Sequence, residues 1–528
     1  MSYRLGIDVG GTNTDVVLLD GDNRVVAKRK RPDSSDIMTG IRDAVRAVLD
    51  DSGVDPVAIS QAMLGTTQVT NAIIERRDLN DVAVVRLGAP ATRAVQPLAG
   101  WPEDLRRRYQ RFSYIVGGGH EFDGREIAPL DEKELTRIAR EVKGQVGAVA
   151  ISSVFSPVNA AHEERAAVIF REELGEDTPI SLSHQIGSVG LLERENATVL
   201  NAAVSKVAKR ATVSFQEALA SIGIHANLYL AQNDGTLMSV EYALLYPILT
   251  IACGPTNSMR GAAYLTGLKD AMVVDVGGTS TDVGVLVHGF PRESFIAVEV
   301  GGVRTNFRMP DLFSIGLGGG SIVRDLDGDL QIGPDSVGYR IVEEGRCFGG
   351  SQTTFTDIAV ALGRARVGTH PVTLPRNRAQ AAYDLAIARV TEAIDRMKTS
   401  ASAVPLILVG GGSVLLPDAF EGVSEVYRPD NYDVANAIGA AIAQVSGRVD
   451  RIFAMDHRSR EEVLEEAQAI AFSEAIRAGA DASTLEVVEM EEVPIAYLPG
   501  NAVRVKVTAA GTLASYERRG AKDSHARS

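Results

Sequence analysis

The 528-residue sequence predicts an α/β protein made of two related halves, with a small α+β appendage at its C-terminal end. Two observations support this fold class. Short apolar runs typical of strands alternate with helix-like segments through most of the chain. In addition, the motif D-V-G-G-T-x-T-D-V occurs twice, at residues 8–16 and 275–283. A repeat at so long a spacing indicates duplicated half-molecules rather than an array of short repeats.

The first predicted half covers residues 1–188 and opens with a β-hairpin. An apolar run, a glycine turn and a second apolar run predict strand, turn and strand over residues 5–19. No helix follows these glycines, unlike those of a dinucleotide fingerprint or a Walker loop. The next expected elements are a helix from about Ser35 to Leu49, a helix opened by residues 65–72, a strand from Val82 to Leu87, a helix from Asp131 to Val142 and a strand from Gly147 to Val154.

The second predicted half covers residues 189–449. A helical pattern from Gly190 to about Leu219 connects the halves, and the second hairpin follows at residues 272–287. A helix is expected from Ala379 to Arg396. The apolar run 405–409 predicts a strand that ends in a strand-to-helix glycine turn, and the small residues of 434–443 predict a helix suited to close packing at a hinge.

The third predicted unit covers residues 450–528 and carries no chemical motif. Ser459 and Glu462 form a capping-box pattern, the helix continues to Ala478, and Gly479 supplies its stop. Strands are expected at 484–490, 493–498 and 503–508, and the polar tail from 517 onward is expected to fray.

Composition excludes several classes of function. The 54 basic and 68 acidic residues give a net charge of −14, which argues against nucleic acid or an anionic membrane as the main partner. Cys253 and Cys347 lie far apart without C-x-x-C spacing, so neither a disulfide framework nor a cysteine zinc site within one chain is expected. The N-terminal segment lacks a secretory-signal pattern, and no apolar stretch approaches a membrane span. We expect a cytoplasmic protein.

Both hairpin turns suit the binding of phosphate. Adjacent glycines let backbone N–H groups converge on an anion, threonine hydroxyls add donors, and an aspartate before the turn can hold Mg²⁺ directly or through water. The alternative is a tight hairpin whose polar side chains cap its own backbone. The predicted phosphate-binding residues are Gly10, Gly11, Thr12, Asn13 and Thr14 in the first copy and Gly277, Gly278, Thr279, Ser280 and Thr281 in the second. Asp8 and Asp275 are the predicted magnesium-binding and catalytic aspartates.

A third glycine cluster completes a nucleotide-binding pattern. Gly410, Gly411, Gly412 and Ser413 follow a predicted strand and would let a base and ribose lie against the backbone. Two phosphate hairpins, one adenosine turn and a small-residue helix, in this order, resemble the actin, sugar-kinase and Hsp70 ATPase fold. The run 316–321 is either another backbone approach to ligand or a flexible turn.

Further motifs point to one family. They lie at residues 5–15, 65–76, 155–163, 181–184, 198–202, 232–239 and 316–321. In this order they resemble the A-type, ATP-using subunit of the hydantoinase/oxoprolinase family. The resemblance implies ATP-dependent opening of a cyclic amide such as 5-oxoproline, a hydantoin or a related lactam. It also implies ATP and Mg²⁺ as cofactors, an oligomer, and a B-type partner subunit that is not evident in this chain.

Phosphoryl transfer to an amide oxygen would give an imidate phosphate that water can attack, a step that depends on positioning and electrostatics. A small-molecule kinase, a regulatory ATPase of the same fold and the ATP-using subunit of a ketone carboxylase remain as alternatives. Residues 253–259 replace the G-P-A-G-G run of many relatives, and the segment 345–357 is shortened, so the substrate stays open.

Several polar residues are candidates for contacting substrate. Thr70 and Asn71 would either orient it or cap the helix they open. His120 and Asp123 would act as acid, base or metal ligand and Arg125 as a carboxylate clamp, unless Asp123 and Gly124 simply close a hairpin. Cys253 is expected to be a buried thiol rather than a nucleophile because the sequence places no base beside it.

Overall fold

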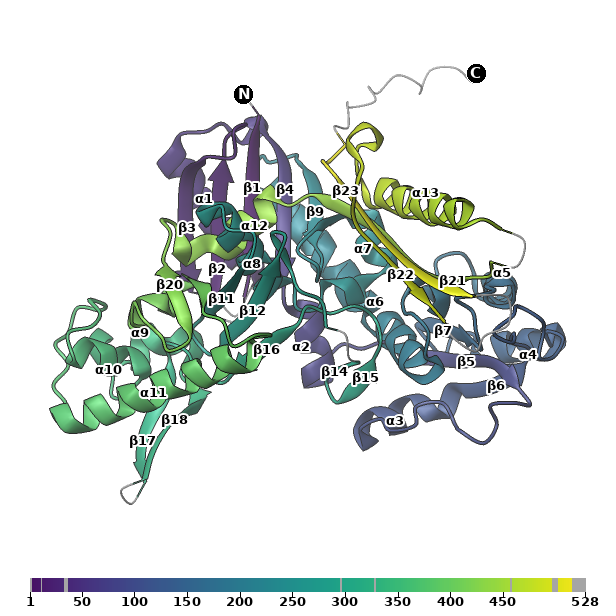
Figure 1. Ribbon diagram of the computed structural model, residues 1–528, viewed down its shortest axis with the longest axis horizontal. Helices are drawn as coiled ribbons and strands as arrows, with labels where there is room; N and C mark the ends of the chain where they lie inside the picture. The colour runs from purple at the N-terminus through teal and green to yellow at the C-terminus, as the bar shows by residue number, and fades with distance from the viewer. Residues whose placement is uncertain are drawn as a thin grey trace.

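A computed structural model describes residues 2–10, 12–32, 37–294, 297–326, 329–455, 458–495 and 502–514 (Figure 1). Its two largest sheets each carry one of the repeated hairpins, and a third sheet lies to one side of them. Among the described residues, no helix is both long and apolar enough to cross a membrane.

The first sheet has the strand order β22-β23-β21-β10-β9-β4-β1-β2-β3. Near one edge of this sheet, β1 pairs antiparallel with β2 and parallel with β4, so that Asp8 lies opposite Asp15 on one side and Gly65 on the other. The strands are β1 (Tyr3–Val9), β2 (Asn13–Leu19), β3 (Val25–Pro32), β4 (Ile59–Thr66), β9 (Asn227–Ala231), β10 (Leu237–Ser239), β21 (Val445–Phe453), β22 (Glu486–Pro494) and β23 (Val503–Gly511).

The second sheet repeats the β2-β1-β4 arrangement of the first. Here β11 pairs antiparallel with β12 and parallel with β19, and Asp275 lies opposite Asp282. This common arrangement confirms the two related halves and both predicted hairpins. The strands are β11 (Ala271–Val276), β12 (Thr281–Val287), β13 (Phe290–Pro291), β16 (Leu312–Ile315), β19 (Val404–Val409) and β20 (Val423–Tyr427), with β16 paired to β12.

Two short helices lie between these sheets. Helix α12 (Ala435–Ile442) packs its apolar face on β2, and α8 (Cys253–Thr266) packs on β11 and β19. The helices cross each other closely, as the small residues of 434–443 predicted. The pair therefore joins the two halves at their centre.

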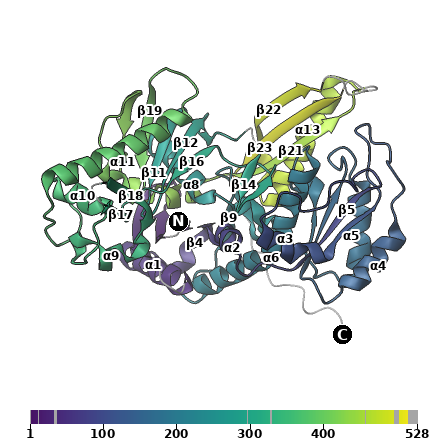
Figure 2. The same cartoon turned by 90° about the horizontal axis from the view of Figure 1, so that it is seen from below.

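The third sheet, in the order β6-β5-β7-β8, is entirely parallel. Alternate residues of β5 pack on α4 and α5 on one face and on α6 on the other, because side chains of a strand alternate between faces. Figure 2 shows the helices on both sides. The elements are β5 (Val82–Ala89), β6 (Ser113–Gly117), β7 (Ala148–Ser153), β8 (Ile180–Leu182), α3 (Glu103–Tyr109), α4 (Glu132–Val142), α5 (Ala161–Leu174) and α6 (Leu191–Ala220).

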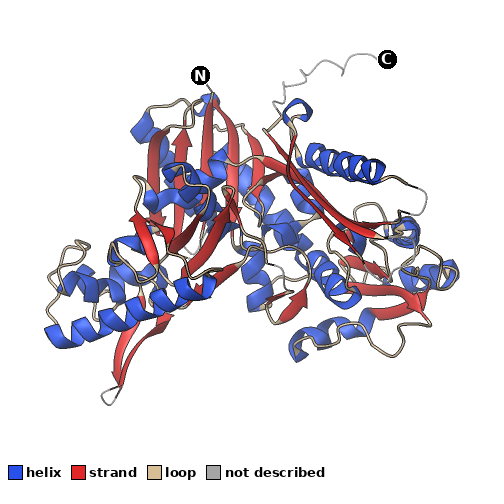
Figure 3. Ribbon diagram, viewed as in Figure 1, coloured by secondary structure: helices blue, strands red, loops and turns tan. Residues whose placement is uncertain are grey.

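The remaining segments contain both helices and strands (Figure 3). These elements are α1 (Ile37–Ser52), α2 (Gln68–Glu75), α7 (Val240–Leu245), α9 (Ile341–Glu344), α10 (Phe355–Ala361), α11 (Arg376–Met397), α13 (Arg460–Ala478), β14 (Val298–Val300), β15 (Val303–Thr305), β17 (Ser321–Leu326) and β18 (Asp329–Ser336). The helices expected near these positions are confirmed, including the capping box at Ser459 and the stop at Gly479.

Three details differ from the sequence-based expectations. The expected strands 484–490 and 493–498 are one strand, β22, because Glu491 pairs across to Lys506 and the ladder continues; residues 496–498 lie outside the described part. The glycine turn after β19 leads into a 3₁₀ helix, Gly411–Leu415, and not an α-helix. The predicted second half contributes β9 and β10 to the first sheet, and the appendage adds β22 and β23 to the same sheet.

Candidate nucleotide site

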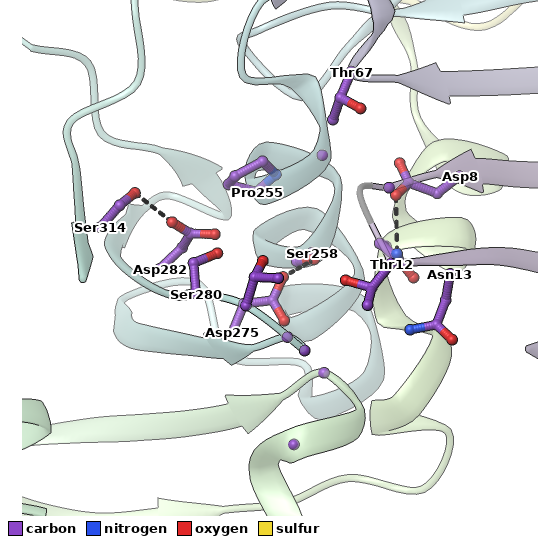
Figure 4. A pocket seen from close by; sticks show the side chains of 18 of the residues that line it. Asp8, Thr12, Asn13, Thr67, Pro255, Ser258, Asp275, Ser280, Asp282 and Ser314 are labelled. Atoms are coloured by element: carbon purple, nitrogen blue, oxygen red, sulfur yellow. Dashed lines mark hydrogen bonds between the residues drawn. The ribbon is translucent and has the colours of Figure 1, made fainter. Parts of the chain in front are cut away.

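A cavity of about 760 Å³ lies between the two hairpins (Figure 4). The turn after β19 and the N-terminal ends of α8 and α12 also contribute to its wall. Of the predicted nucleotide-site residues, those that line it are Asp8, Gly10, Thr12, Asn13, Asp275, Gly277, Gly278, Thr279, Ser280, Gly410, Gly411 and Gly412. The structure thus brings together residues from three distant parts of the sequence.

Three predicted residues do not line this cavity, and a fourth lies outside the described part of the chain. Thr14, Thr281 and Ser413 are buried behind it, and the Thr281 hydroxyl donates to the carbonyl oxygen of Leu317 at 2.6 Å. Gly11 lies outside the described residues. The roles of these four residues remain predictions.

The two hairpin turns close in the same way. The N–H of Gly10 donates to the carbonyl oxygen of Asn13 at 3.1 Å, and that of Gly277 donates to Ser280 at 2.9 Å. The glycine run at 316–321 supports the second turn, because the N–H of Gly319 donates to the oxygen of Gly277 at 3.0 Å. The run therefore packs against the second hairpin, and an approach of its backbone to a ligand stays a prediction.

Asp8 is buried and is held by two amides from the central helices. Nδ2 of Asn257 in α8 lies 3.3 Å from Oδ1 of Asp8, and Nδ2 of Asn436 in α12 lies 2.9 Å from Oδ2. Burial, with the nearby charge of Asp15, raises the pKa of Asp8 from 3.8 to about 6. The carboxylate is thus positioned by neutral donors.

The second hairpin holds two comparable carboxyl groups. The hydroxyl of Ser258 in α8 donates to Oδ2 of Asp275 at 2.5 Å, and burial raises the pKa of Asp275. The hydroxyl of Ser314 donates to Asp282, whose pKa burial raises to about 6. Asp275 and Asp282 both line the cavity, and Figure 4 shows both side chains beside Ser280.

Asp15, the counterpart of Asp282 in the first hairpin, has a different environment. Nζ of Lys30 lies 2.8 and 2.7 Å from its two carboxylate oxygens, and Nδ2 of Asn436 donates to it at 2.8 Å. Lys30 also donates to the carbonyl oxygen of Asp433 at 3.2 Å. Of the two equivalent aspartates, Asp15 is therefore neutralised by a lysine, whereas Asp282 accepts a hydrogen bond from the neutral hydroxyl of Ser314.

The site residues fit a bound Mg²⁺. Asp8 is buried and Asp275 is partly buried, and both carboxyl groups accept hydrogen bonds from neutral donors, so a cation would compensate their charge. Within the described ranges, no group of three or more His, Cys, Asp or Glu side chains is arranged as a metal cage. This agrees with Mg²⁺, which commonly takes one or two carboxylates, several waters and the phosphates of a substrate.

The predicted substrate residues fall in two places. Thr70 lines the nucleotide cavity, whereas Nδ2 of Asn71 donates to the hydroxyl of Thr67 at 3.4 Å within the same helix turn. His120, Asp123 and Arg125 belong to the loop after β6 and line no described pocket together with the hairpins.

The loop after β6 forms its own contacts. His120 is buried with its ring 4.3 Å from that of His162, and Asp123 pairs with Arg125 at 2.7 Å on the surface.

Cys253 is buried, its thiol donates to the carbonyl oxygen of Thr66 at 3.4 Å, and burial raises its pKa to about 12. A thiol with so high a pKa is a poor nucleophile.

Sequence reasoning missed several residues of the site. Asn257, Ser258 and Asn436 lie on helices and Lys30 on an edge strand, and none of them belongs to a glycine motif. The one available signal was that residues 253–259 depart from the family pattern. Asp282 and Ser314 were missed because the role of the repeated motif was assigned to its first aspartate.

Two family models together match most of the chain. The model for the hydantoinase/oxoprolinase N-terminal region matches residues 4–174, and the hydantoinase/oxoprolinase model matches residues 194–404. The chain belongs to the hydantoinase/oxoprolinase family. The resemblance seen in the sequence is confirmed.

Two curated relatives illustrate the family. The chain is 29% identical to caprolactamase subunit alpha of Pseudomonas jessenii over 469 residues, which cover 83% of this chain and 65% of the relative. It is 28% identical to the acetophenone carboxylase gamma subunit of Aromatoleum aromaticum over 414 residues, covering 71% and 55%. The chain therefore spans less than two thirds of the length of either relative.

Two solved structures share the fold. The crystal structure of ATP-dependent caprolactamase from Pseudomonas jessenii superposes with a TM-score of 0.77 at 21% identity and covers 97% of this chain and 88% of that chain. Nucleotide-free acetone carboxylase gives a TM-score of 0.68 at 19% identity, with the same two coverages. The predicted ATPase fold class is confirmed.

Proposed function

We propose that this chain binds ATP with Mg²⁺ and uses it to activate a cyclic amide for hydrolytic opening. The observation that carries the proposal is that two Asp-bearing glycine hairpins and a third glycine turn line one cavity. Backbone N–H groups of Thr12, Asn13, Thr279 and Ser280 and the hydroxyls beside them are the candidate phosphate donors. Asp8 and Asp275 would hold Mg²⁺, which supplies charge neutralisation for the phosphates.

The cavity has two apolar ends that suit two different ligands. One end is formed by Ile341, Phe348, Val367 and Val414 beside the glycine turn 410–412, which supports the placement of adenosine there. The other end is formed by residues of a separate core cluster that includes α2 and β14. This second end would hold the group that accepts the phosphoryl unit.

The proposed reaction starts from an amide, whose carbonyl is a poor electrophile. The amide oxygen forms a bond to the γ-phosphorus of ATP, the bond from that phosphorus to the β-γ bridging oxygen breaks, and ADP leaves. The proton on the ring nitrogen passes to a base, giving an imidate phosphate. Water then adds to the activated carbon, and the C–N bond breaks as the nitrogen takes up a proton, which leaves an acyl phosphate. A second water displaces phosphate from this acyl phosphate to give the amino acid. Asp282 lines the cavity and forms no ion pair with a lysine or arginine of the described residues, so we assign it as the proton acceptor.

The rest of the proposed enzyme lies outside this chain. The relatives are named as subunits, and the chain spans less than two thirds of two of them. We propose that a B-type hydantoinase/oxoprolinase subunit completes the hydrolytic steps and that the assembly is an oligomer.

A second candidate is the ATP-using subunit of a ketone carboxylase. Similarity to the acetophenone carboxylase gamma subunit and to the acetone carboxylase structure supports it. Phosphoryl transfer to a ketone oxygen would use the same hairpins. The two candidates differ in the acceptor and in a requirement for bicarbonate.

The test measures ADP release by the purified full chain, alone and with a co-purified B-type partner. Lactams and hydantoins form one panel, and ketones with and without bicarbonate form the other. We expect a cyclic amide to raise ADP release and Asp8→Ala to abolish that rise, whereas Asp177→Ala, at an exposed position far from the hairpins in the sequence, leaves it unchanged. If only ketones with bicarbonate respond, the carboxylase candidate replaces the first, and if neither panel responds with the partner present, both are wrong.

A further inference from the structure

We infer that the acceptor bound by this chain is an uncharged cyclic amide that carries no carboxylate. The inference rests on the proposed function and adds the charge class of the substrate. It comes from the charges and the apolar side chains around the acceptor end of the cavity.

The acceptor end is built from apolar side chains of four segments. Ile251, Val300 and Met309 are buried members of the same core cluster, and Val298 packs against it. All four line the cavity, together with Ile74 on the outer side of α2. Thr67 and Thr70, also on its wall, supply the neutral hydrogen-bonding groups of this segment. Such a surface suits a ring of methylene groups with one amide.

The charged residues around the cavity are almost all acidic. Among the described residues that line it, Lys30 is the only lysine or arginine, and both carboxylate oxygens of Asp15 lie within 2.8 Å of its ammonium group. The acidic residues on the wall are Asp8, Asp15, Asp275, Asp282, Asp433 and Glu299. A substrate carboxylate would lose its hydration without gaining a cationic partner, and would be repelled by Glu299 beside Val298 and Val300.

The arginines next to the acceptor end in sequence are bound to other groups, although Arg76 contacts Gly301 on the cavity wall. Arg76, at the end of α2, donates to Oδ2 of Asp104 and to the carbonyl oxygen of Gly301, both at 2.8 Å. Arg308, beside Met309, lines a separate cavity of about 360 Å³ and pairs with Glu293 at 3.2 Å and Asp450 at 3.4 Å. Neither guanidinium lines the nucleotide cavity.

The decisive comparison uses two ligands with the same ring. 5-Oxoproline carries a carboxylate, and 5-oxoprolinamide replaces it with a neutral carboxamide of similar size. ADP release is measured for each at pH 7 with the full chain and its B-type partner. We expect kcat/KM for 5-oxoprolinamide to exceed that for 5-oxoproline by at least about tenfold, since an unpaired charge is costly in a site without a countercharge. Unsubstituted lactams should also be accepted.

A charge-reversal variant tests the same point from the side of the protein. Ile74 is 57% exposed, so a longer polar side chain fits there without disturbing the core. Ile74→Lys should raise kcat/KM for 5-oxoproline by about tenfold, the gain expected from one ion pair in a partly shielded site. Ile74→Met controls for side-chain length, and Val57→Lys, on the surface outside the cavity, controls for net charge.

Each outcome has a defined meaning. The inference is supported if the unmodified chain has a higher kcat/KM for 5-oxoprolinamide than for 5-oxoproline, and if Ile74→Lys reduces this ratio whereas neither control variant does. Equal or better use of 5-oxoproline by the unmodified chain overturns the inference and leaves the proposed function standing. No rise in ADP release with any cyclic amide overturns the proposed function, and the inference with it.

Discussion

Asp8 and Gly65 lie so close together that a Cβ atom at Gly65 would be 2.1 Å from Oδ1 of Asp8. The contact arises because β1 and β4 are parallel neighbours whose register sets the two residues side by side. The second half repeats it, since a Cβ at Gly410 would be 2.2 Å from Oδ1 of Asp275. In each half, a glycine of the neighbouring strand or the turn after it leaves room for the aspartate of the hairpin.

Gly65→Ala is therefore expected to lower ATP hydrolysis by about 10²-fold, because the added methyl group must displace the Asp8 carboxylate by roughly an ångström or more. ADP release under saturating ATP measures this loss, and thermal unfolding shows whether the fold survives. Gly21→Ala is the matched control, because the nearest atom to a Cβ there is 4.0 Å away. Full activity of Gly65→Ala would show that the position of Asp8 does not limit turnover.

Asp8→Asn should stabilise the nucleotide-free chain at pH 7 while it abolishes ATP hydrolysis. Burial raises the pKa of Asp8 from 3.8 to about 6, so the folded state binds this proton more tightly than the unfolded state. Stability from this group is then present below pH 4 and is lost as the pH rises to about 6. The asparagine side chain does not ionise, so it carries no buried charge at pH 7. The melting temperature of Asp8→Asn should therefore exceed that of the wild type at pH 7 and match it at pH 4. If the melting temperatures of Asp8→Asn and the wild type differed by the same amount at pH 7 and at pH 4, the raised pKa of Asp8 would be contradicted.

The parts of the fold that local patterns encode could be predicted from the sequence. Both hairpins depend on a turn motif, and α13 depends on a capping box at Ser459 and a glycine stop at Gly479, whose φ is 109°. Local patterns do not encode which strand pairs with which. An apolar run predicts that β9 is a strand, but its pairing with β4 is a contact between residues far apart in the chain. The sequence therefore predicted the elements and missed which sheet they join.

The site shows the same division. Its glycine turns could be predicted because they need special backbone geometry, which restricts the residue type. The residues that position the carboxylates could not be predicted. Asn257 and Asn436 have no distinguishing sequence pattern, and only the tertiary fold brings both amides to Asp8. Lys30 likewise gains its role only when β3 pairs with β2 beside Asp15.

Asp282→Asn tests the proton acceptor. Its pKa is raised by burial to about 6, so the wild-type rate should rise with pH through about 6 as the carboxylate becomes a base. Asp282→Asn should lower kcat by about 10²–10⁴-fold and remove that rise, the range expected for loss of a general base. The measurement is a pH–rate profile at saturating ATP and acceptor. An unchanged profile in Asp282→Asn would exclude this role.

Ser314→Ala supplies a more conservative test of the same carboxyl group. The Ser314 hydroxyl donates to Asp282 and lowers its pKa, partly offsetting the effect of burial. Without this hydrogen bond the pKa of Asp282 should rise, so the acidic limb of the pH–rate profile should move to higher pH while the rate on the alkaline plateau is largely kept. A merely structural role for Ser314 would lower the rate at every pH without moving the limb.

Gly439→Ala tests the crossing of the two central helices. A Cβ at Gly439 would lie 1.8 Å from the carbonyl oxygen of Asn257, and a Cβ at Gly261 would lie 1.9 Å from that of Ala435. Alanine normally stabilises a helix interior by about 1 kcal/mol relative to glycine, but here the backbones must separate, so we expect a loss of about 1–3 kcal/mol. Since Asn257 also holds Asp8, ATP hydrolysis should fall as well. Gly254→Ala in α8 is the control, because a Cβ there would lie 4.0 Å from its nearest neighbour, Oδ2 of Asp8. This substitution should not lower the melting temperature. A melting temperature for Gly439→Ala at or above that of the wild type would mean that the helices can move apart without cost, and that their close contact does not hold the two halves together.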